Sequence, residues 1–172
     1  MPKTYTAAGS ATAGDVYTAA AHNIIVTDVN NFIVPPACRL QQSAAQTVPD
    51  STTTALAFGN EIYDTDGMHD NATNNSRITI QTAGIYIVTA SVGYTSTPTA
   101  ANELYIQLGG STRIVEDSAL SGAAYKCVSV TYAFSAADYI EVIVYADGPR
   151  TTRYASLPGV THFAATWIGR TS

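Results

Sequence analysis

Hydrophobic residues occupy every second position over much of this chain from Ala37 onward. In the segment 77–82, Ile78 and Ile80 alternate with polar residues, which is typical of a β-strand with one buried face. Short runs of the same kind are separated by Gly, Asn, Asp and Pro, which favour turns. The pattern predicts eight or more strands, within residues 38–42, 54–58, 77–82, 85–94, 104–108, 112–115, 125–134, 139–145 and 161–168.

Turn signals recur at intervals of roughly 8–12 residues, and no helical pattern separates the strands. This arrangement favours an antiparallel sandwich or jelly roll over a parallel α/β sheet. The two longest strands, 85–94 and 125–134, carry hydrophobic residues on both faces. Because the outer face of a monomeric sandwich is normally polar, we expect a neighbouring subunit to cover one face of these strands.

Residues 1–36 follow a different pattern. Thr18 is a suitable helix N-cap, and three alanines, which are good helix formers, follow it. Hydrophobic residues then recur every three or four positions, which predicts a helix over 19–32 that ends before a Pro-Pro pair. These residues form one stripe, which consists of Ala21, Ile25, Val29 and Phe32. Because so short a helix is marginal alone, we expect the stripe to dock on a partner. The chain thus divides into an N-terminal piece, 1–36, whose first part (1–17) is an extended arm, and a β domain, 37–172.

The composition fits one domain with a short appendage. The chain has 172 residues, of which 46% are hydrophobic and 12% are charged, with a net charge of -5. The charged share is about half of the typical ~25%. Either Thr, Ser and Asn dominate the surface, or other subunits cover part of it. The hydrophobic content excludes general disorder. The absence of basic clusters argues against nucleic-acid binding, and no apolar run is long enough for a membrane span. The first residues lack the apolar core of a secretion signal.

Three aspartates, Asp64, Asp66 and Asp70, lie close together in the sequence around Gly67. Carboxylates at such spacing offer the hard oxygen ligands that calcium prefers, but the spacing is not that of an EF-hand. Aspartates also bond the backbone of their own turn. We favour the turn over a calcium site, and we expect no cofactor.

Other reactive side chains are scattered. His22, His69 and His162 fall in three different predicted elements, and Cys38 and Cys127 lack metal-ligand spacing. The chain has neither a Gly-x-Ser-x-Gly elbow nor a glycine-rich phosphate loop, so we expect a protein that is not an enzyme. One further segment could contact a receptor, or could be an ordinary solvated loop; its residues are Arg150, Arg153 and Tyr154.

Four segments together resemble a known family. They are residues 58–69, which include Tyr63-Asp-Thr-Asp-Gly-Met-His69, and residues 77–86, 136–142 and 163–169. Their order resembles the globular head of the complement q-subunit and tumour-necrosis-factor superfamily, in the branch found in virion proteins of tailed bacteriophages. The resemblance covers about residues 37–170. Residues 13–23 are similar to a leader common in phage structural proteins.

The resemblance implies ten strands in two five-stranded sheets and a homotrimer. The resulting candidates for the trimer interface lie on the two longest strands: Tyr86, Val88, Val130, Tyr132 and Phe134. It also implies that Cys38 and Cys127 lie on strands of one sheet that are not neighbours, so that both stay reduced.

The functional expectation follows from this resemblance. We expect a structural protein on the surface of a phage particle, a head decoration or head fibre attached through residues 1–36. Its partners would be its own copies and other virion proteins. The alternative is a tail-associated protein that binds a host surface receptor. A secreted bacterial adhesion or signalling domain is a weaker third candidate.

Overall fold

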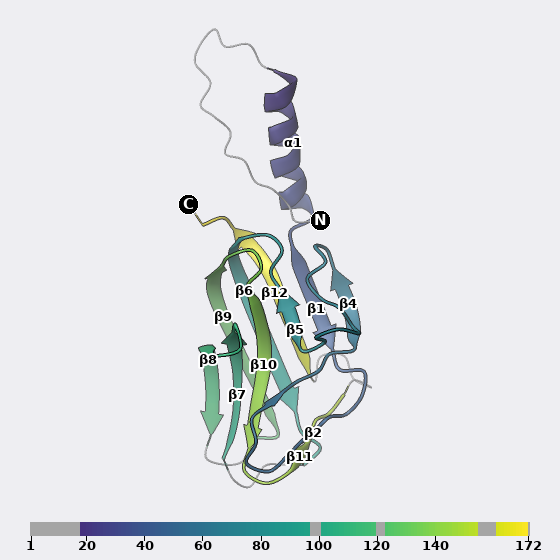
Figure 1. The fold of residues 1–172 in the computed structure, drawn as a ribbon, viewed down its shortest axis with the longest axis vertical. Helices are drawn as coiled ribbons and strands as arrows, with labels where there is room; N and C mark the ends of the chain where they lie inside the picture. Colours follow the sequence, from purple (N-terminus) through teal and green to yellow (C-terminus); the bar gives the residue numbers. More distant parts are fainter. Residues whose placement is uncertain (1–17, 97–100, 120–122, 155–160, 172) are drawn as a thin grey trace.

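The computed structural model describes residues 18–96, 101–119, 123–154 and 161–171 (Figure 1). One helix precedes a β-sandwich. The elements are α1 (Ala19–Ile33), β1 (Ala37–Gln41), β2 (Thr47–Val48), β3 (Thr54–Ala55), β4 (Asn60–Asp64), β5 (Arg77–Thr79), β6 (Gly84–Gly93), β7 (Asn102–Leu108), β8 (Thr112–Ala119), β9 (Tyr125–Phe134), β10 (Tyr139–Ala146), β11 (Arg150–Thr151) and β12 (His162–Gly169).

Two five-stranded antiparallel sheets pack face to face. The first sheet has the order β4-β1-β12-β6-β9, and the second has the order β3-β10-β7-β8, with β5 also paired to β10. A small third pair joins β11 to β2. The expected sandwich of two five-stranded sheets is therefore confirmed. The strand β4 was not predicted, because all but one of its residues are exposed and it lies at the edge of the first sheet.

The core lies between the two sheets, and in β6 and β9 alternate side chains fill it. In β6 the even-numbered side chains point inward, and Tyr86, Val88 and Val92 are completely buried. In β9 Phe134 is buried in the same way, and its ring meets that of Tyr86 edge to face, with centroids 5.9 Å apart. Alternation therefore turns the odd-numbered residues of both strands outward.

This alternation corrects the predicted trimer interface. Tyr86, Val88 and Phe134 are buried within a single chain, and Val130 and Tyr132 on the same side of β9 pack against the same core. A side chain that fills the core of its own subunit has no surface left for a neighbouring subunit. Tyr86, Val88 and Phe134 are therefore not available as interface contacts, because the inward face of each strand was taken for the outward face. Val130 and Tyr132 are only half-buried, so they keep some exposed surface and stay a prediction.

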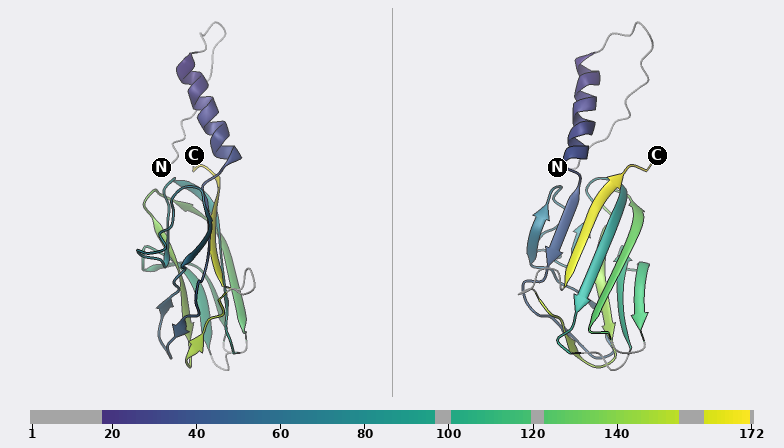
Figure 2. Two further views of the ribbon diagram at one scale, coloured as in Figure 1. Left: turned by 90° about the vertical axis from the view of Figure 1, so that its right-hand side faces the viewer. Right: turned by 180° about the vertical axis from the view of Figure 1, so that it is seen from behind.

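The helix begins and ends close to where the sequence predicts. The Thr18 Oγ1 accepts a hydrogen bond from the backbone N–H of Ala21 at 3.2 Å, which is an N-cap contact. The helix stops at Ile33, shortly before the two prolines. It stands beyond one end of the sandwich (Figures 1 and 2). The predicted arm, 1–17, lies outside the described residues.

The base of the helix contacts the end of the core. The rings of Phe32 and Trp167 meet edge to face, with centroids 6.1 Å apart. Trp167 is buried, while Phe32 stays 71% exposed.

Among the described residues, none of the helices has the length and hydrophobicity that crossing a membrane requires.

Candidate functional site

Three neighbouring strands of the first sheet, β6, β9 and β12, carry no Asp, Glu, Lys or Arg on their outward side, and Arg39 on the next strand, β1, borders them opposite Ala164. We call this surface the open face. Most of its residues are small, hydroxylated or aliphatic, while Tyr125 and His162 stand at one end: Ile85, Ile87, Thr89, Ser91, Tyr125, Cys127, Ser129, Thr131, Ala133, His162, Ala164, Thr166 and Ile168. The side chains of Ile87 and Ile168 are 41% and 49% exposed. The open face is therefore a continuous surface without charge, on which aliphatic groups meet solvent.

Register pairing builds this face from distant segments. Ile87 lies opposite Thr131 on β9 and opposite Thr166 on β12. At one end of the face, Ser91 lies between Cys127 and His162, and the Ser91 Oγ is 2.7 Å from the His162 Nδ1. Polar groups on this face are thus mostly the hydroxyls of Ser and Thr.

The outward face of the second sheet is different. The Arg113 guanidinium bridges the carboxylates of Glu103 and Glu116 at 3.1 and 2.7 Å and lies 3.8 Å over the Tyr105 ring. Ion pairs of this kind are ordinary on a solvent-exposed surface and contribute little to stability. The two faces of the sandwich therefore differ in charge, and the open face is the one suited to contact with another protein.

The helix α1 presents a second hydrophobic surface. Within the predicted docking stripe, Ile25, Val29 and Phe32 are 43%, 49% and 71% exposed, and Ala21 is half-buried. Val26 and Ile33, which the sequence analysis did not single out, are exposed as well. Apart from its base, where Phe32 meets Trp167, the stripe faces away from the sandwich core.

The three aspartates form a turn. The Asp64 carboxylate accepts hydrogen bonds from the backbone N–H groups of Asp66 (3.0 Å), Met68 (2.5 Å) and His69 (2.9 Å). The Asp66 Oδ2 accepts a hydrogen bond from Thr82 Oγ1 at 2.8 Å. The turn interpretation is therefore confirmed for Asp64, whereas Asp66 bonds a side chain from the following β5–β6 connection. Within the described ranges, no three His, Cys, Asp or Glu side chains gather as a metal site would require.

The carboxylate of Asp70 caps the next part of the same loop. Its Oδ1 accepts hydrogen bonds from the backbone N–H of Ala72 and Thr73 at 2.8 and 3.1 Å. These bonds stabilise the charged form, so they hold the pKa of Asp70 below its ordinary value.

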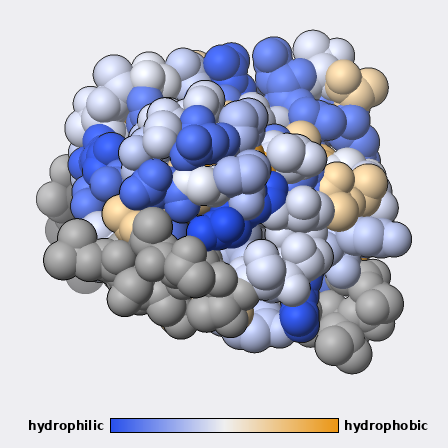
Figure 3. Space-filling model, turned by 90° about the horizontal axis from the view of Figure 1, so that it is seen from below, coloured by the Kyte–Doolittle hydropathy of each residue, from blue (hydrophilic) through white to orange (hydrophobic). Residues whose placement is uncertain are grey.

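The candidate receptor segment lies at the end of the sandwich away from α1. The Arg150 Nη1 and Nη2 donate hydrogen bonds to the carbonyls of Pro149 and Asp147. The Arg153 Nη1 donates to the Tyr125 hydroxyl at 2.6 Å, a partner on β9 that the sequence did not indicate. Tyr154 is 51% exposed. Figure 3 shows that the described surface at this end is mostly hydrophilic.

The two cysteines lie on opposite sides of the first sheet. Cys38 on β1 is buried in the core, and Cys127 on β9 is exposed on the open face; both thiols are free. Burial raises the pKa of the Cys38 thiol far above its ordinary value, and the charges of Asp64 and Glu61 add to this effect. Strands β12 and β6 separate β1 from β9, as the resemblance implies.

No family model matches this chain, and no curated protein sequence matches it. Several solved structures are similar to it. A structure of murine APRIL has a TM-score of 0.59 at 11% identity, and the match covers 77% of this chain and 98% of the APRIL chain. Eiger TNF from S. frugiperda has a TM-score of 0.59 at 10% identity, with 80% and 96% covered.

A third similar structure comes from the complement proteins. The globular domain of zebrafish complement 1qA protein has a TM-score of 0.55 at 8% identity, with 79% of this chain and 99% of that one covered. At these identities the likeness concerns the fold. This chain has the jelly-roll fold that the tumour-necrosis-factor-like and complement globular domains share.

Proposed function

We propose that this protein is a non-enzymatic structural protein of a tailed-bacteriophage particle. It forms a homotrimer through the open face of the jelly roll and attaches to the particle through its N-terminal piece, as a head decoration or head fibre. The phage context rests on the sequence motifs at 13–23 and 58–69. The observation that carries the proposal is the difference between the two outer faces of the sandwich: the open face has no charged side chain, and the outer face of the second sheet is charged.

Self-association follows from the chemistry of that face. Ile85, Ile87 and Ile168 supply apolar area whose removal from water is favourable, at roughly 25 cal/mol per Å². The neighbouring Ala, Ser and Thr side chains are short, so another subunit can approach closely without burying a charge. A closed ring of three copies would cover the open face and leave the charged faces in solvent.

Attachment through the helix follows from its position. The stripe of Ile25, Val29 and Phe32 lies outside the sandwich and is exposed, and a fifteen-residue helix is marginal in water without a partner. Docking on a shell protein would bury this stripe. The helix stands at one end of the sandwich (Figure 2), so the other end would then point away from the particle.

The exposed far end supports a second candidate, a tail-associated protein that binds a host surface receptor. Tyr154 is exposed there, and Arg153 and Tyr125 form a polar pair beside it. Aromatic and arginine side chains at an exposed tip are common in binding surfaces. This candidate shares the trimer and the attachment and differs in the place on the particle.

Electron cryo-microscopy of particles with this protein labelled distinguishes the candidates. A genetically fused tag at Ser172 would be decorated with a gold-labelled antibody. We expect label at many symmetry-related sites on the head. Label confined to the tail would replace the head assignment with the receptor-binding one, and purified particles without label would contradict both.

A further inference from the structure

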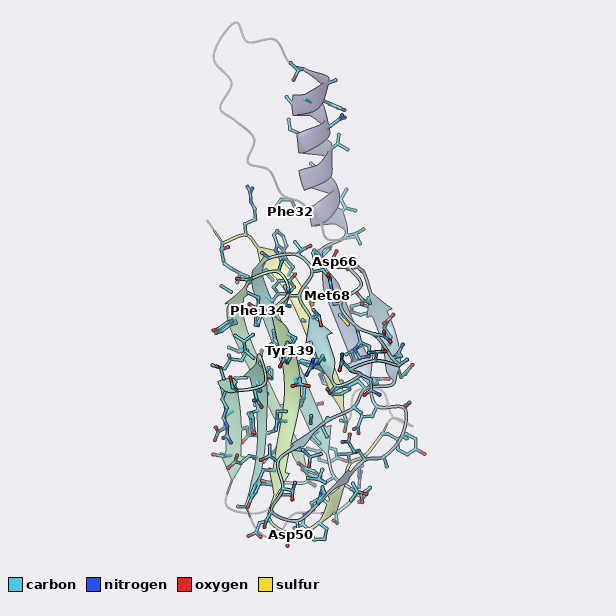
Figure 4. All side chains as sticks on the ribbon, in the orientation of Figure 1. Phe32, Asp50, Asp66, Met68, Phe134 and Tyr139 are labelled. Carbon is cyan, nitrogen blue, oxygen red and sulfur yellow. The ribbon has the colours of Figure 1, made fainter. Side chains whose placement is uncertain are left out.

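A cavity of about 400 Å³ opens on the outer side of the second sheet. The loop that follows the Asp64 turn forms one wall, and β5 with the start of β10 forms the other. The residues that matter for its chemistry are Asp70, Thr73, Asn74, Arg77, Gln81 and Tyr139. Figure 4 labels Tyr139 and Met68, two residues that line it. The volume lies within the range of small-molecule sites, roughly 300–1,000 Å³.

The loop wall is fixed in place. The His69 ring lies between two backbone carbonyls, with Nδ1 2.7 Å from the oxygen of Arg77 and Nε2 2.9 Å from that of Phe58. The ring nitrogen that carries the hydrogen donates to one of these carbonyls. The backbone N–H of Thr79 donates to the Met68 carbonyl at 2.7 Å and ties the loop to β5. A wall held in this way costs little ordering on ligand binding.

Arg77 is positioned with donors to spare. Its guanidinium lies 4.0 Å over the Tyr139 ring, and its Nε donates to the Glu141 Oε1 at 3.2 Å. Glu141 is buried and also accepts a hydrogen bond from Ser76 at 2.7 Å. In the part of the chain that the structure describes, Nη1 and Nη2 of Arg77 have no hydrogen-bond partner. Two oriented donors thus remain at a residue that lines the cavity.

The other polar groups complement these donors. Asp70 supplies a carboxylate oxygen beyond the one that caps the loop. Asn74 and Gln81 each carry an amide that both donates and accepts, and Thr73 supplies a hydroxyl. Apolar contact is minor, because Met68 is 1% exposed and the Tyr139 ring is covered on one face by Arg77. The cavity is lined by hydrogen-bonding groups of both kinds.

The balance of charge selects the ligand class. The negative charges of Asp70 and Glu141 disfavour the binding of phosphate or another anion, and the positive charge of Arg77 disfavours the binding of a metal cation. An apolar ligand would leave the donors and acceptors unpaired. A neutral sugar ring fits, because each of its hydroxyls donates one hydrogen bond and accepts others. We propose that this cavity binds a neutral pyranose unit of a saccharide. The site lies within one jelly roll and depends neither on the trimer nor on attachment to a particle.

Titration of the isotope-labelled full chain, followed by two-dimensional amide NMR, tests the proposal. The probes are glucose, galactose, mannose, rhamnose and N-acetylglucosamine, each added alone, with inorganic phosphate and calcium chloride as charged probes. At least one sugar should shift amides of residues 67–81 and of Tyr139 in a saturable way. Saturable binding of phosphate or calcium at these residues without sugar binding would overturn the assignment, and so would no saturable shift with any probe.

Two variants remove ligand contacts while sparing the fold. Asn74 has a φ of 53°, so Asn74→Gly keeps the left-handed backbone and deletes only the amide. Gln81→Ala removes a half-buried side chain. Each substitution should raise the dissociation constant of the sugar about fivefold, which is the loss expected for one hydrogen bond. Ser118→Ala, on exposed β8, is the matched control and should leave affinity unchanged. Unchanged affinity in both cavity variants, with native amide spectra, would overturn the proposal.

Discussion

Gly84 lies at the start of β6, where the structure leaves no room for a side chain. A Cβ at this position would overlap the Trp167 indole and would lie 2.6 Å from the carbonyl oxygen of Gly169. The φ of 154° is also unfavourable for other residues. Trp167 in turn supports Phe32 at the base of the helix. One glycine therefore fixes the packing at the junction between sandwich and helix.

We predict that Gly84→Ala destabilises the protein. The overlap forces Trp167 or the backbone of β12 to move, and overpacking of this kind costs about 2–3 kcal/mol in the free energy of unfolding. Urea denaturation measures the change. Gly169→Ala is the control, because nothing lies within 4 Å of a Cβ there, and it should change stability by less than about 0.5 kcal/mol. Equal stabilities of the two variants would refute this account of the junction.

Tyr94 gives a prediction with a pH dependence. Its side chain is completely buried, and its hydroxyl has no hydrogen-bond partner among the described residues. Burial raises the pKa of Tyr94 from 10.0 to about 12. Tyr94→Phe removes the unpaired hydroxyl and should raise the free energy of unfolding by about 1 kcal/mol at pH 7.

The sign of the pH effect follows from that shift. The folded protein favours the neutral phenol. The part of the free energy of unfolding that depends on protonation of Tyr94 is therefore fully present below pH 10 and is lost as the pH rises toward 12. Stability of the wild type should therefore fall faster than that of Tyr94→Phe between these two pH values. Denaturation curves at several pH values measure the difference. Parallel curves for the two proteins would contradict it.

At the scale of elements, alternation predicted the strands well but not their orientation. In β6, Ile85 and Ile87 on one side are as hydrophobic as Tyr86 and Val88 on the other, so size and hydropathy alone did not decide which side faces the core. The hydroxyl groups decide it. Thr89 and Ser91, like Ser129 and Thr131 of β9, all stand at odd positions, and these are the outward ones.

Other features depend on long-range contacts that a pattern cannot give. The sugar cavity needs β5 beside β10, where Thr79 pairs with Tyr139. The contact of Arg153 with Tyr125 likewise joins residues from different strands or loops. The helix was predictable because its N-cap, its alanines and its stopping prolines are all local signals.

The helix itself gives a prediction about attachment. Deletion of residues 1–36 should leave the jelly roll folded, with a melting temperature within a few degrees of the full chain, because the core lies beyond this segment. The same deletion should abolish incorporation into particles. Calorimetry and quantitative blotting of purified particles measure the two effects.

A double substitution controls for the loss of the arm. Ile25→Asp with Phe32→Asp places charge on the exposed stripe, which docking cannot bury without cost, and it should also prevent incorporation. The control is Thr112→Asp, which adds a charge at an exposed position of β8 and should leave incorporation unchanged. Full occupancy of particles by the deletion protein would show that attachment runs through the jelly roll.

At the scale of the whole molecule, the two faces of the sandwich have different chemistry. The open face has aliphatic and hydroxyl groups without charge, whereas the second sheet carries ion pairs such as Arg113 with Glu116. A charged fraction of only 12% agrees with a molecule that does not expose all of its surface. Assembly through the open face accounts for both observations, and the particle function that we propose depends on it.

The mass of the full chain in solution tests this assembly most directly. Light scattering coupled to size exclusion, at micromolar concentration, should give three times the chain mass of 18.0 kDa. Ile87→Asp, which puts a charge at the centre of the open face, should give a folded monomer, while Thr112→Asp on the second sheet should remain a trimer. A wild-type protein that elutes with the mass of a single chain would contradict the account.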